Sequence, residues 1–234
     1  MVRDAAVRVA GRWLVGITMA LAMACSSAAP RDVEGPPAEA AGVPQPLELG
    51  DGPYERAGDK DGVAVFERAG SSLIRIGAEG RLPAPPEQVL TALLDYSRHA
   101  DVLERLAECR VLERGEDWLV VYQRLGLPVI DDRDFALRLT WGKAADRHWI
   151  RYRTVSAGPP PTAGVVRVTR HFGGWDLLPA EGGRATLARY QSNIDMAGSV
   201  PGWMTKSGAA DELPALFRSM CRLLPPPYTD RCRR

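Results

Sequence analysis

Residues 106–194 alternate apolar and polar side chains with a period of two, interrupted by short segments of turn-forming residues. This alternation is typical of half-buried β-strands. It is clearest in "RDFALRLTWG", where one face carries Phe135, Leu137, Leu139 and Trp141 and the other carries Ala136, Arg138 and Thr140. Because the turns are too short for helical crossovers, consecutive strands must pair antiparallel. The centre of the chain is therefore predicted to be an antiparallel meander of about five or six strands.

Two short strands and two helices are predicted around this meander. The runs "VAVFERAG" (63–70) and "LIRIGAEGRL" (73–82) form a predicted hairpin, joined by Gly-Ser-Ser. A helix is expected to begin at Pro85 and Pro86 and to end near His99. A long helix is expected to begin near Pro201, with an apolar stripe formed by Trp203, Ala210, Leu213, Phe217, Met220 and Leu224. This order predicts an α+β domain, in which helices pack on one face of a strongly curved antiparallel sheet.

The C-terminal helix combines its apolar stripe with the small residues Ser207, Gly208 and Ala209. A helix that only filled a core would be expected to carry larger side chains there, so small residues favour a space for a ligand against the sheet. The alternative is tight packing, in which the small residues contact strand backbone. Pro214 is expected to kink this helix or to end its first part.

The first 24 residues have the features of an export signal. Arg3, Arg8 and Arg12 make a basic start, and the apolar run "WLVGITMALAMA" is too short for a membrane-spanning helix. "LAMAC" resembles a bacterial lipobox, which implies cleavage before Cys25 and acylation of its thiol. The expected location is then the bacterial cell envelope, with the protein anchored at the outer membrane on its periplasmic face. Ordinary signal peptidase could also cut at this bond and leave a soluble secreted or periplasmic protein.

Residues 25–53 are predicted to be a disordered tether, because they are rich in Pro, Ala and Gly and contain few large apolar residues. A flexible segment of this length spans about 30 Å. The folded domain is expected over residues 54–228, and residues 229–234 are expected to be a short tail.

The formal net charge of +1 provides no electrostatic basis for binding nucleic acid. Beyond Cys25, the cysteines are Cys109, Cys221 and Cys232, and an oxidising compartment permits one disulfide among them without indicating which. The sequence has no C-x-x-C pair, so neither a zinc site nor any other metal or cofactor is expected.

Three features resemble the START (steroidogenic-acute-regulatory-related lipid-transfer) family of the helix-grip, Bet v 1-like superfamily. "LPVIDDRDFALRLTW" (127–141) is similar to the family's Pro-x-x-x-Arg-Asp-Phe segment. "HFGGWDLLPAEGGRATLARYQSNIDMAGSVPGWM" (171–204) is similar to its Gly-x-Trp-x-Leu-x-Pro, Thr-x-x-x-Tyr and Asp-x-x-Gly-x-x-Pro-x-Trp motifs. The third feature is the order of the elements. The resemblance covers residues 63–224 and implies one lipid or sterol-like molecule held in a tunnel between the sheet and the C-terminal helix. The protein is expected to be a monomer.

The resemblance suggests ligand-binding roles for Arg138, Tyr122, Tyr152, Tyr190, Trp203, Met204, Ser207 and Phe217. For the tyrosines and Trp203, simple core packing is the alternative. Arg138 could meet a ligand head group or a distant acid, whereas strand alternation favours a position facing water. Arg133 and Asp134 are expected to have structural roles, and Asp195 to brace the junction before the last helix.

The predicted function is binding or transfer of a lipid at a membrane surface. Gly198–Trp203 and the 158–164 loop are expected to gate the tunnel. The same fold type also includes polyketide cyclases, aromatases and hydrolytic enzymes, which need a positioned acid or base. His99, His148 and His171 lack a partner pattern and are expected to be structural, so no catalytic residue is predicted. A third possibility is an envelope scaffold that binds a protein segment in the same groove.

Overall fold

The computed structural model describes residues 42–50, 52–69, 73–198 and 209–232. The chain divides into two units, residues 1–34 and 35–234, and the described residues all belong to the second unit. Several predictions lie outside the described residues, namely the export signal, Cys25 and the ligand-binding roles of Trp203, Met204 and Ser207.

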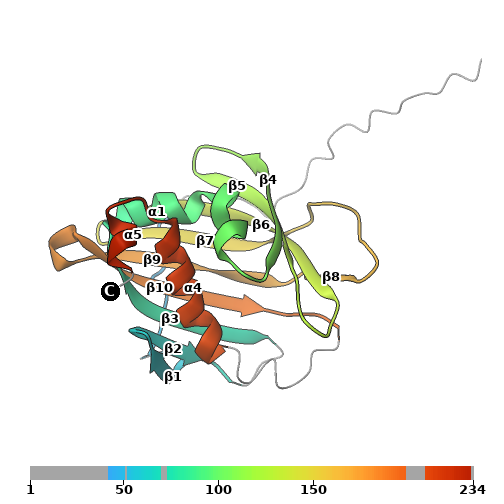
Figure 1. Cartoon of the computed structure of the whole chain (residues 1–234), viewed down its shortest axis with the longest axis horizontal. Helices are drawn as coiled ribbons and strands as arrows, with labels where there is room; N and C mark the ends of the chain where they lie inside the picture. The colour runs from blue at the N-terminus through green and yellow to red at the C-terminus, as the bar shows by residue number, and fades with distance from the viewer. Residues whose placement is uncertain (1–41, 51, 70–72, 199–208, 233–234) are drawn as a thin grey trace, which may run out of the picture. The chain divides into compact units, whose positions relative to one another are not determined.

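Ten strands of the described residues form one sheet, in the order β1-β2-β3-β10-β9-β7-β6-β5-β4, with β8 attached to β6 (Figure 1). The strands are β1 Glu55–Lys60, β2 Val63–Glu67, β3 Ile74–Leu82, β4 Leu106–Arg114, β5 Trp118–Leu125, β6 Asp132–Lys143, β7 His148–Val155, β8 Val165–Arg167, β9 His171–Ala180 and β10 Ala185–Ile194. Neighbouring strands along this order pair antiparallel, which confirms the predicted meander. The last strand returns to pair with β3, which joins the first hairpin to the meander.

β8 departs from the predicted meander because it pairs with β6 in parallel. Its three residues lie opposite Asp132, Arg133 and Asp134. The chain between residues 165 and 180 therefore forms two strands, β8 and β9. The chain can make this parallel pairing because β7 and the long loop after it carry it back along β6.

The edge strand β1 was not predicted from the sequence. All six of its residues are exposed, so the strand carries no apolar alternation that could reveal it. A tight turn at Asp61 and Gly62, both with positive φ, connects β1 to β2. β1 thus extends the predicted hairpin of β2 and β3 by one strand.

The helices are α1 Pro86–Leu94, α2 His99–Val102, α4 Ala209–Leu223 and α5 Tyr228–Arg231, with short 3-10 turns at η1 Tyr96–Arg98 and η2 Glu181–Gly183. The first predicted helix ends before His99, because the backbone of Asp95 leaves the helical region (φ −83°, ψ 71°). α4 continues through Pro214, so this proline does not end the helix as one alternative had predicted.

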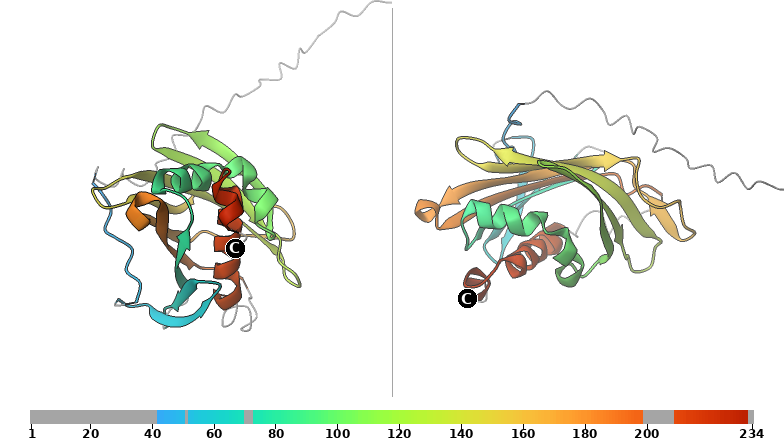
Figure 2. Two further views of the ribbon diagram at one scale, coloured as in Figure 1. Left: turned by 60° about the vertical axis from the view of Figure 1, so that its left-hand side comes forward. Right: turned by 90° about the horizontal axis from the view of Figure 1, so that it is seen from above.

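The sheet curves around α1 and α4, which lie on the same side of it (Figure 2). The inward-facing residues of β6 are buried against this side, as the alternation predicts, and they include Phe135, Leu137 and Leu139. Leu213, Phe217 and Met220 complete the same core from α4. The concave face of the sheet and the apolar stripe of α4 therefore form one hydrophobic interior.

Residues 42–50 lie on the opposite, convex face of the sheet, although they fall within the predicted tether. The backbone N–H of Leu47 donates a hydrogen bond of 2.7 Å to the buried carboxylate of Asp176. Arg147 and Arg151 donate to the carbonyls of Pro44 and Gln45. The tether prediction is thus wrong for this part, because Arg147 and Arg151 satisfy backbone carbonyls of the segment and its Leu47 side chain is buried.

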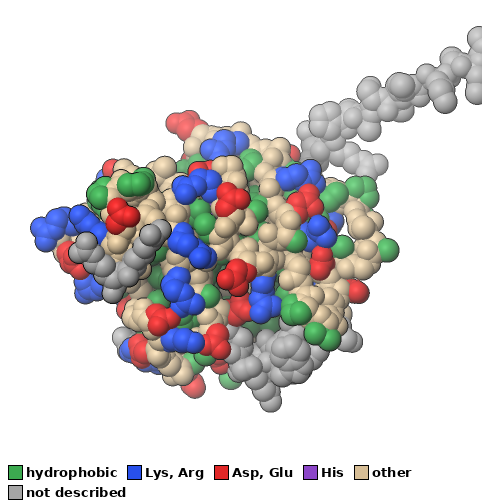
Figure 3. Space-filling model, in the orientation of Figure 1, with side chains coloured by type: hydrophobic (Ala, Val, Ile, Leu, Met, Phe, Trp, Pro, Cys, Tyr) green, Lys and Arg blue, Asp and Glu red, His purple; other side chains and the backbone are tan. Residues whose placement is uncertain are grey.

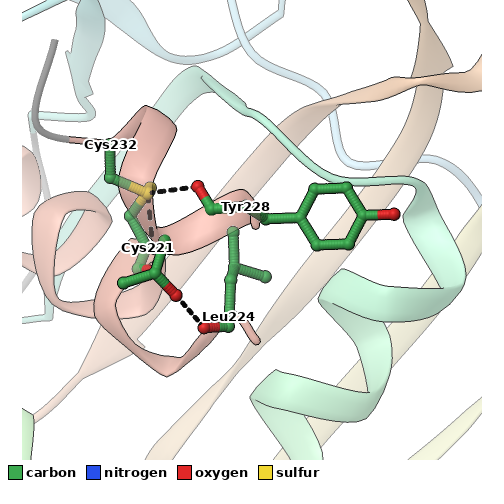
Figure 4. The surroundings of a disulfide bond; sticks show 5 residues. Cys221, Leu224, Tyr228 and Cys232 are labelled. Carbon is green, nitrogen blue, oxygen red and sulfur yellow. Dashed lines mark hydrogen bonds between the residues drawn. A yellow bond between two sulfur atoms is a disulfide. The ribbon is translucent and has the colours of Figure 1, made fainter. Parts of the chain in front are cut away.

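The C-terminal end of α4 is joined to the segment after α5 by a disulfide between Cys221 and Cys232 (Figure 4). The sequence had left the pairing open, and Cys109 is the cysteine that stays free among those described. Since α5 and Cys232 are held in this way, residues 229–232 belong to the folded domain rather than to the predicted tail.

Candidate functional site

A cavity of about 100 Å³ lies between the concave face of the sheet and the helices. Its walls come from α1, η1, α2, strands β5, β6, β7, β9 and β10, and α4. The lining residues are Leu93, Tyr96, His99, Leu103, Gln123, Leu137, Leu139, Ile150, Tyr152, His171, Trp175, Tyr190, Leu216 and Met220. An apolar hollow with a few converging polar groups is the usual character of a small-molecule site.

Two tyrosine hydroxyls meet on the cavity wall. The hydroxyls of Tyr152 on β7 and Tyr190 on β10 are 3.2 Å apart, and Tyr152 also lies 3.2 Å from the carbonyl oxygen of Gln191. Burial raises the pKa of both tyrosines. Both hydroxyls therefore stay protonated at neutral pH and can donate as well as accept hydrogen bonds.

β9 lies between β7 and β10 in the sheet, so the Tyr152 side chain must cross β9 to reach Tyr190. A glycine in β9 makes this crossing possible. Gly173 of β9 pairs with Tyr152 and Ser192 in the sheet register. A Cβ atom at Gly173 would lie 2.7 Å from the Tyr152 hydroxyl and 2.0 Å from the Gln191 carbonyl oxygen. The missing side chain thus allows the Tyr152 hydroxyl to reach β10.

His171 lies next to the tyrosine pair. Its Nε2 is 3.1 Å from the Ser192 hydroxyl, and its ring meets Phe135 and Tyr152 edge-on at centroid distances of 5.0 and 5.1 Å. Its Nδ1 is buried without a hydrogen-bond partner. Burial lowers the pKa of His171 to about 4, so the ring is neutral at physiological pH.

His99 approaches the cavity from the helical side. Burial lowers its pKa to about 4, and hydrogen bonds to the backbone of Leu93 and Ala92 oppose this shift. Its Nε2 is buried and has no partner. The backbone carbonyls must therefore accept from Nδ1–H, which leaves Nε2 as a bare acceptor in the neutral ring.

Aromatic rings and the stripe of α4 close the apolar part of the wall. Trp175 packs against Tyr190 at a centroid distance of 4.6 Å and against Phe217 at 5.5 Å. Leu216 and Met220 of α4 complete the lining. Phe217, which was predicted to contact the ligand, is buried one layer behind the lining, where it supports Trp175.

Tyr122 and Arg138 lie on the convex side of the sheet, so their predicted ligand-binding roles are wrong. Tyr122 pairs with Ala136 in register, whereas the inward-facing neighbours on β5 are Val121 and Gln123. The Tyr122 hydroxyl donates to Asp134 at 3.1 Å. Val120 and Tyr122 share this convex face and are both buried, so the apolar alternation of β5 does not reveal which of its faces points toward the helices.

Arg138 points away from the cavity, as strand alternation predicts. It lies opposite Val120, and its guanidinium stacks 4.0 Å from the ring of Trp118. The structure thus provides Arg138 with an aromatic partner away from the cavity, and the ligand role suggested by the resemblance does not apply.

The expected structural residues also have defined partners. Arg133 is buried and donates to the carbonyls of Asp131, Met196 and Ala197. Asp195 accepts a hydrogen bond of 3.0 Å from the backbone of Ala197, so it braces the segment after β10.

Sequence reasoning did not place His99 and His171 at the site. The position of His171 could have been predicted from the sequence. It lies four residues before the inward-facing Trp175 on the same strand, so both side chains point to the same face of the sheet. His99 offered no such signal, since its position depends on the break between α1 and α2.

A second and wider groove of about 350 Å³ lies at the end of β7. Residues 154–158 and 167–169 line it, and most of them are polar or small. The Arg167 guanidinium is bound by Asp134 at 2.6 and 2.8 Å. Because of its polar lining, this groove is less suited to an apolar ligand than the cavity between the sheet and α4.

The surface on the helical side mixes Lys and Arg with Asp and Glu, with no large area of one sign (Figure 3). Within the described ranges, no helix is long and apolar enough to cross a membrane. The same residues contain no cluster of three or more metal-ligating side chains.

Comparisons with known proteins agree with this architecture. No family model matches the chain. An uncharacterized protein of Pseudomonas aeruginosa, PA1579, is 27% identical over 166 residues, which cover 68% of this chain and 80% of that protein.

Among solved structures, a STAR-related lipid transfer protein from Xanthomonas axonopodis superposes with a TM-score of 0.66 at 25% identity, covering 74% of this chain and 99% of that chain. Human STARD10 superposes with a TM-score of 0.64 at 18% identity, covering 73% and 74%. Human StAR-related lipid transfer protein 5 superposes with a TM-score of 0.63 at 16% identity, covering 74% and 86%. The described domain therefore has the helix-grip fold of STAR-related lipid-transfer domains.

Proposed function

We propose that this domain, as a monomer, binds one hydrophobic molecule between the concave face of the sheet and α4, and carries it at a membrane surface. The observation that carries the proposal is the interior cavity, where an apolar wall surrounds buried ring nitrogens that lack partners. A ligand with a polar end would satisfy such atoms, and its apolar body would cover the wall. The similarity to proteins named for lipid transfer supports this choice of ligand.

Binding a lipid-sized molecule requires the domain to open. The cavity of about 100 Å³ is smaller than the roughly 300–1,000 Å³ typical of ligand sites. α4 is the wall best suited to move, since its side chains close the cavity from outside the sheet. The apolar contacts that α4 gives up would be replaced by contacts with the ligand, so opening in the presence of ligand costs little buried apolar area.

The contacts of α4 indicate which end moves. Near its N-terminal end, Asp211 pairs with Lys60 and Glu212 pairs with Arg105, and all four side chains are about half exposed or more. Exposed pairs of this kind contribute only about 0–1 kcal/mol each. The polar contacts at the N-terminal end of α4 are therefore weak, and the buried contacts of Leu213 are the apolar contacts that the ligand would have to replace when this end swings away from the sheet.

The C-terminal end of α4 is fastened more firmly. The Cys221–Cys232 disulfide holds α5 against it, and Arg98 donates to the carbonyl of Leu223 at 2.9 Å. Ser219 donates to the carbonyl of Val102 at 2.8 Å. We therefore place the hinge of the opening motion at this end.

The first test is to purify the protein, extract it with organic solvent and analyse the extract by mass spectrometry, with native mass spectrometry of the intact complex alongside. One apolar molecule per chain is expected. If neither the isolated protein nor protein incubated with lipid vesicles carries such a molecule, the proposal is wrong.

A second test examines the role of α4. Cysteines introduced at Lys60 and Asp211 in a Cys109→Ser background, joined by a short bismaleimide, should block ligand uptake. The same variant without the reagent should load normally, and labelling with a monofunctional maleimide controls for the modification itself. Normal uptake by the crosslinked protein would show that α4 does not open.

We further propose that acylation of Cys25 anchors the protein in a bacterial envelope membrane, on the periplasmic face of the outer membrane. The lipobox-like "LAMAC" and the disulfide, which is favoured in an oxidising compartment, support this location. Labelling cells with a palmitate analogue should mark the parent protein and leave Cys25→Ala unlabelled. No incorporation into the parent would leave the soluble secreted form as the better description.

A further inference from the structure

The cavity wall contains no formal charge among the described residues. Its polar members are Tyr96, Gln123, Tyr152 and Tyr190 together with His99 and His171, and no Lys, Arg, Asp or Glu of the described chain lines it. The buried histidines do not supply a charge either, since the pKa of each is about 4. A charged ligand group would therefore lose its hydration without gaining a counter-charge from this wall.

Arg133 is a candidate for a counter-ion, because it is buried and lies on the same face of β6 as the inward-facing Phe135. Each of its three nitrogens donates to a backbone carbonyl, namely those of Met196, Asp131 and Ala197. It is also absent from the lining. Arg133 therefore braces the segment after β10 rather than presenting a cation to the cavity.

The unpaired nitrogen of His99 indicates which neutral polar group fits the cavity. Nε2 of His99 is a bare acceptor, because Nδ1 carries the ring proton. It needs a donor from the ligand. The hydroxyl pair of Tyr152 and Tyr190 can supply a donor to a ligand oxygen. A ligand hydroxyl satisfies both requirements, since it donates one hydrogen bond and accepts others.

We propose that the ligand of this cavity is an uncharged apolar molecule whose polar end is a hydroxyl group, an alcohol rather than a carboxylic acid or a phosphate ester. The inference rests on the proposed function and narrows it to a ligand class. A carboxylate offers only acceptors, so it would place negative charge against the lone pair of His99 Nε2. A group with neither donor nor charge, such as an ester, would leave that nitrogen unpaired.

The test uses the full-length protein and four decyl compounds that differ only in the polar end, with binding measured by isothermal titration calorimetry at pH 7.5. The compounds are 1-decanol, methyl decanoate, decanoate and decylammonium. Decanol should bind about three- to tenfold more tightly than methyl decanoate, which is the range expected for one hydrogen bond. Decanoate and decylammonium should each bind at least about 100-fold more weakly than decanol, because their charges are desolvated.

The outcomes separate this inference from the proposed function. If no compound binds, the proposed function fails together with the inference. If decanoate or decylammonium binds within threefold of decanol, the site tolerates charge and the inference is overturned while the proposed function stands. If methyl decanoate binds as tightly as decanol, the ligand does not need a hydroxyl donor and the inference is overturned.

Variants locate the effect. His99→Leu should remove the preference for decanol over methyl decanoate. Tyr152→Phe should weaken the binding of decanol about three- to tenfold. Tyr122→Phe is the matched control, since it removes a buried tyrosine hydroxyl from the convex face and should leave every affinity unchanged. Circular dichroism checks that each variant is folded, and if His99→Leu does not fold, the ligand series on the unmodified protein still decides the question.

Discussion

Tyr152 and Tyr190 come from strands that do not pair with each other, yet their hydroxyls lie 3.2 Å apart above the strand between them. The intervening strand, β9, has glycine at the crossing point, and Gly173 lies directly opposite Tyr152 in register. One backbone position without a side chain therefore determines the polar end of the cavity.

Gly173→Ala should destabilise the domain by at least about 2 kcal/mol, because the added methyl group would overlap the Gln191 carbonyl oxygen and the Tyr152 hydroxyl. Urea unfolding followed by circular dichroism measures the change in the free energy of unfolding. Gly58→Ala is the control, since nothing lies within 4 Å of a Cβ at that position, and its effect should stay within about 0.5 kcal/mol. Equal effects for the two variants would contradict the proposed crowding at Gly173.

Asp134→Ala should cost about 2–4 kcal/mol of stability, because it removes a buried carboxylate that accepts from both Arg167 and Tyr122. The control is Asp59→Ala, which breaks an ion pair with Arg56 that is more than half exposed. That change should cost far less, because an exposed ion pair is screened by water. The same unfolding experiment compares the two, and a loss below 1 kcal/mol for Asp134→Ala would show that β8 does not depend on this carboxylate.

The fold could be predicted from the sequence where side-chain periodicity reports burial on one face. β6 shows this, since Phe135, Leu137 and Leu139 are inward as alternation predicts. The same reasoning fails for β5, because side chains on its convex face are also buried. Tyr122 is buried there as fully as an inward residue, and alternation cannot show which of two buried faces meets the helices.

The candidate site was harder to predict because it depends on contacts between distant elements. Tyr152 and Tyr190 line the cavity, so their ligand-binding roles stay predictions, whereas the position of His99 depends on where α1 ends. The docking of residues 42–50 is a similar case. It depends on Arg147 and Arg151, about 100 residues later in the chain, and no local composition reveals such hydrogen bonds.

Removing the disulfide by Cys232→Ala should lower the free energy of unfolding by up to about 3 kcal/mol, as chain-entropy arguments give for a loop of this size. Hydrogen exchange should then increase in α5 and at the C-terminal end of α4, while β6 and β7 stay protected. A reducing agent should destabilise the parent protein by a similar amount and leave the variant unchanged. If reduction affects both proteins equally, the loss has a cause other than this bond.

Acid should destabilise the domain through its buried histidines. In the folded protein the pKa values of His99 and His171 are about 4, below the ordinary value of 6.5 given for each. Between these values the unfolded chain binds more protons than the folded one, so stability is fully present above pH 6.5 and is lost as the pH falls toward 4. Each histidine should lower the free energy of unfolding by about 2 kcal/mol between pH 7 and pH 4.5.

Urea unfolding of the parent protein and of His171→Gln at pH 7, 5.5 and 4.5 measures this loss. The variant should lose about 2 kcal/mol less than the parent over that range, because its amide does not titrate. Carboxylates that protonate near pH 4.5 are present in both proteins and cancel in the difference. Identical pH profiles would mean that folding does not lower the pKa of His171, and the neutral cavity wall would then be contradicted.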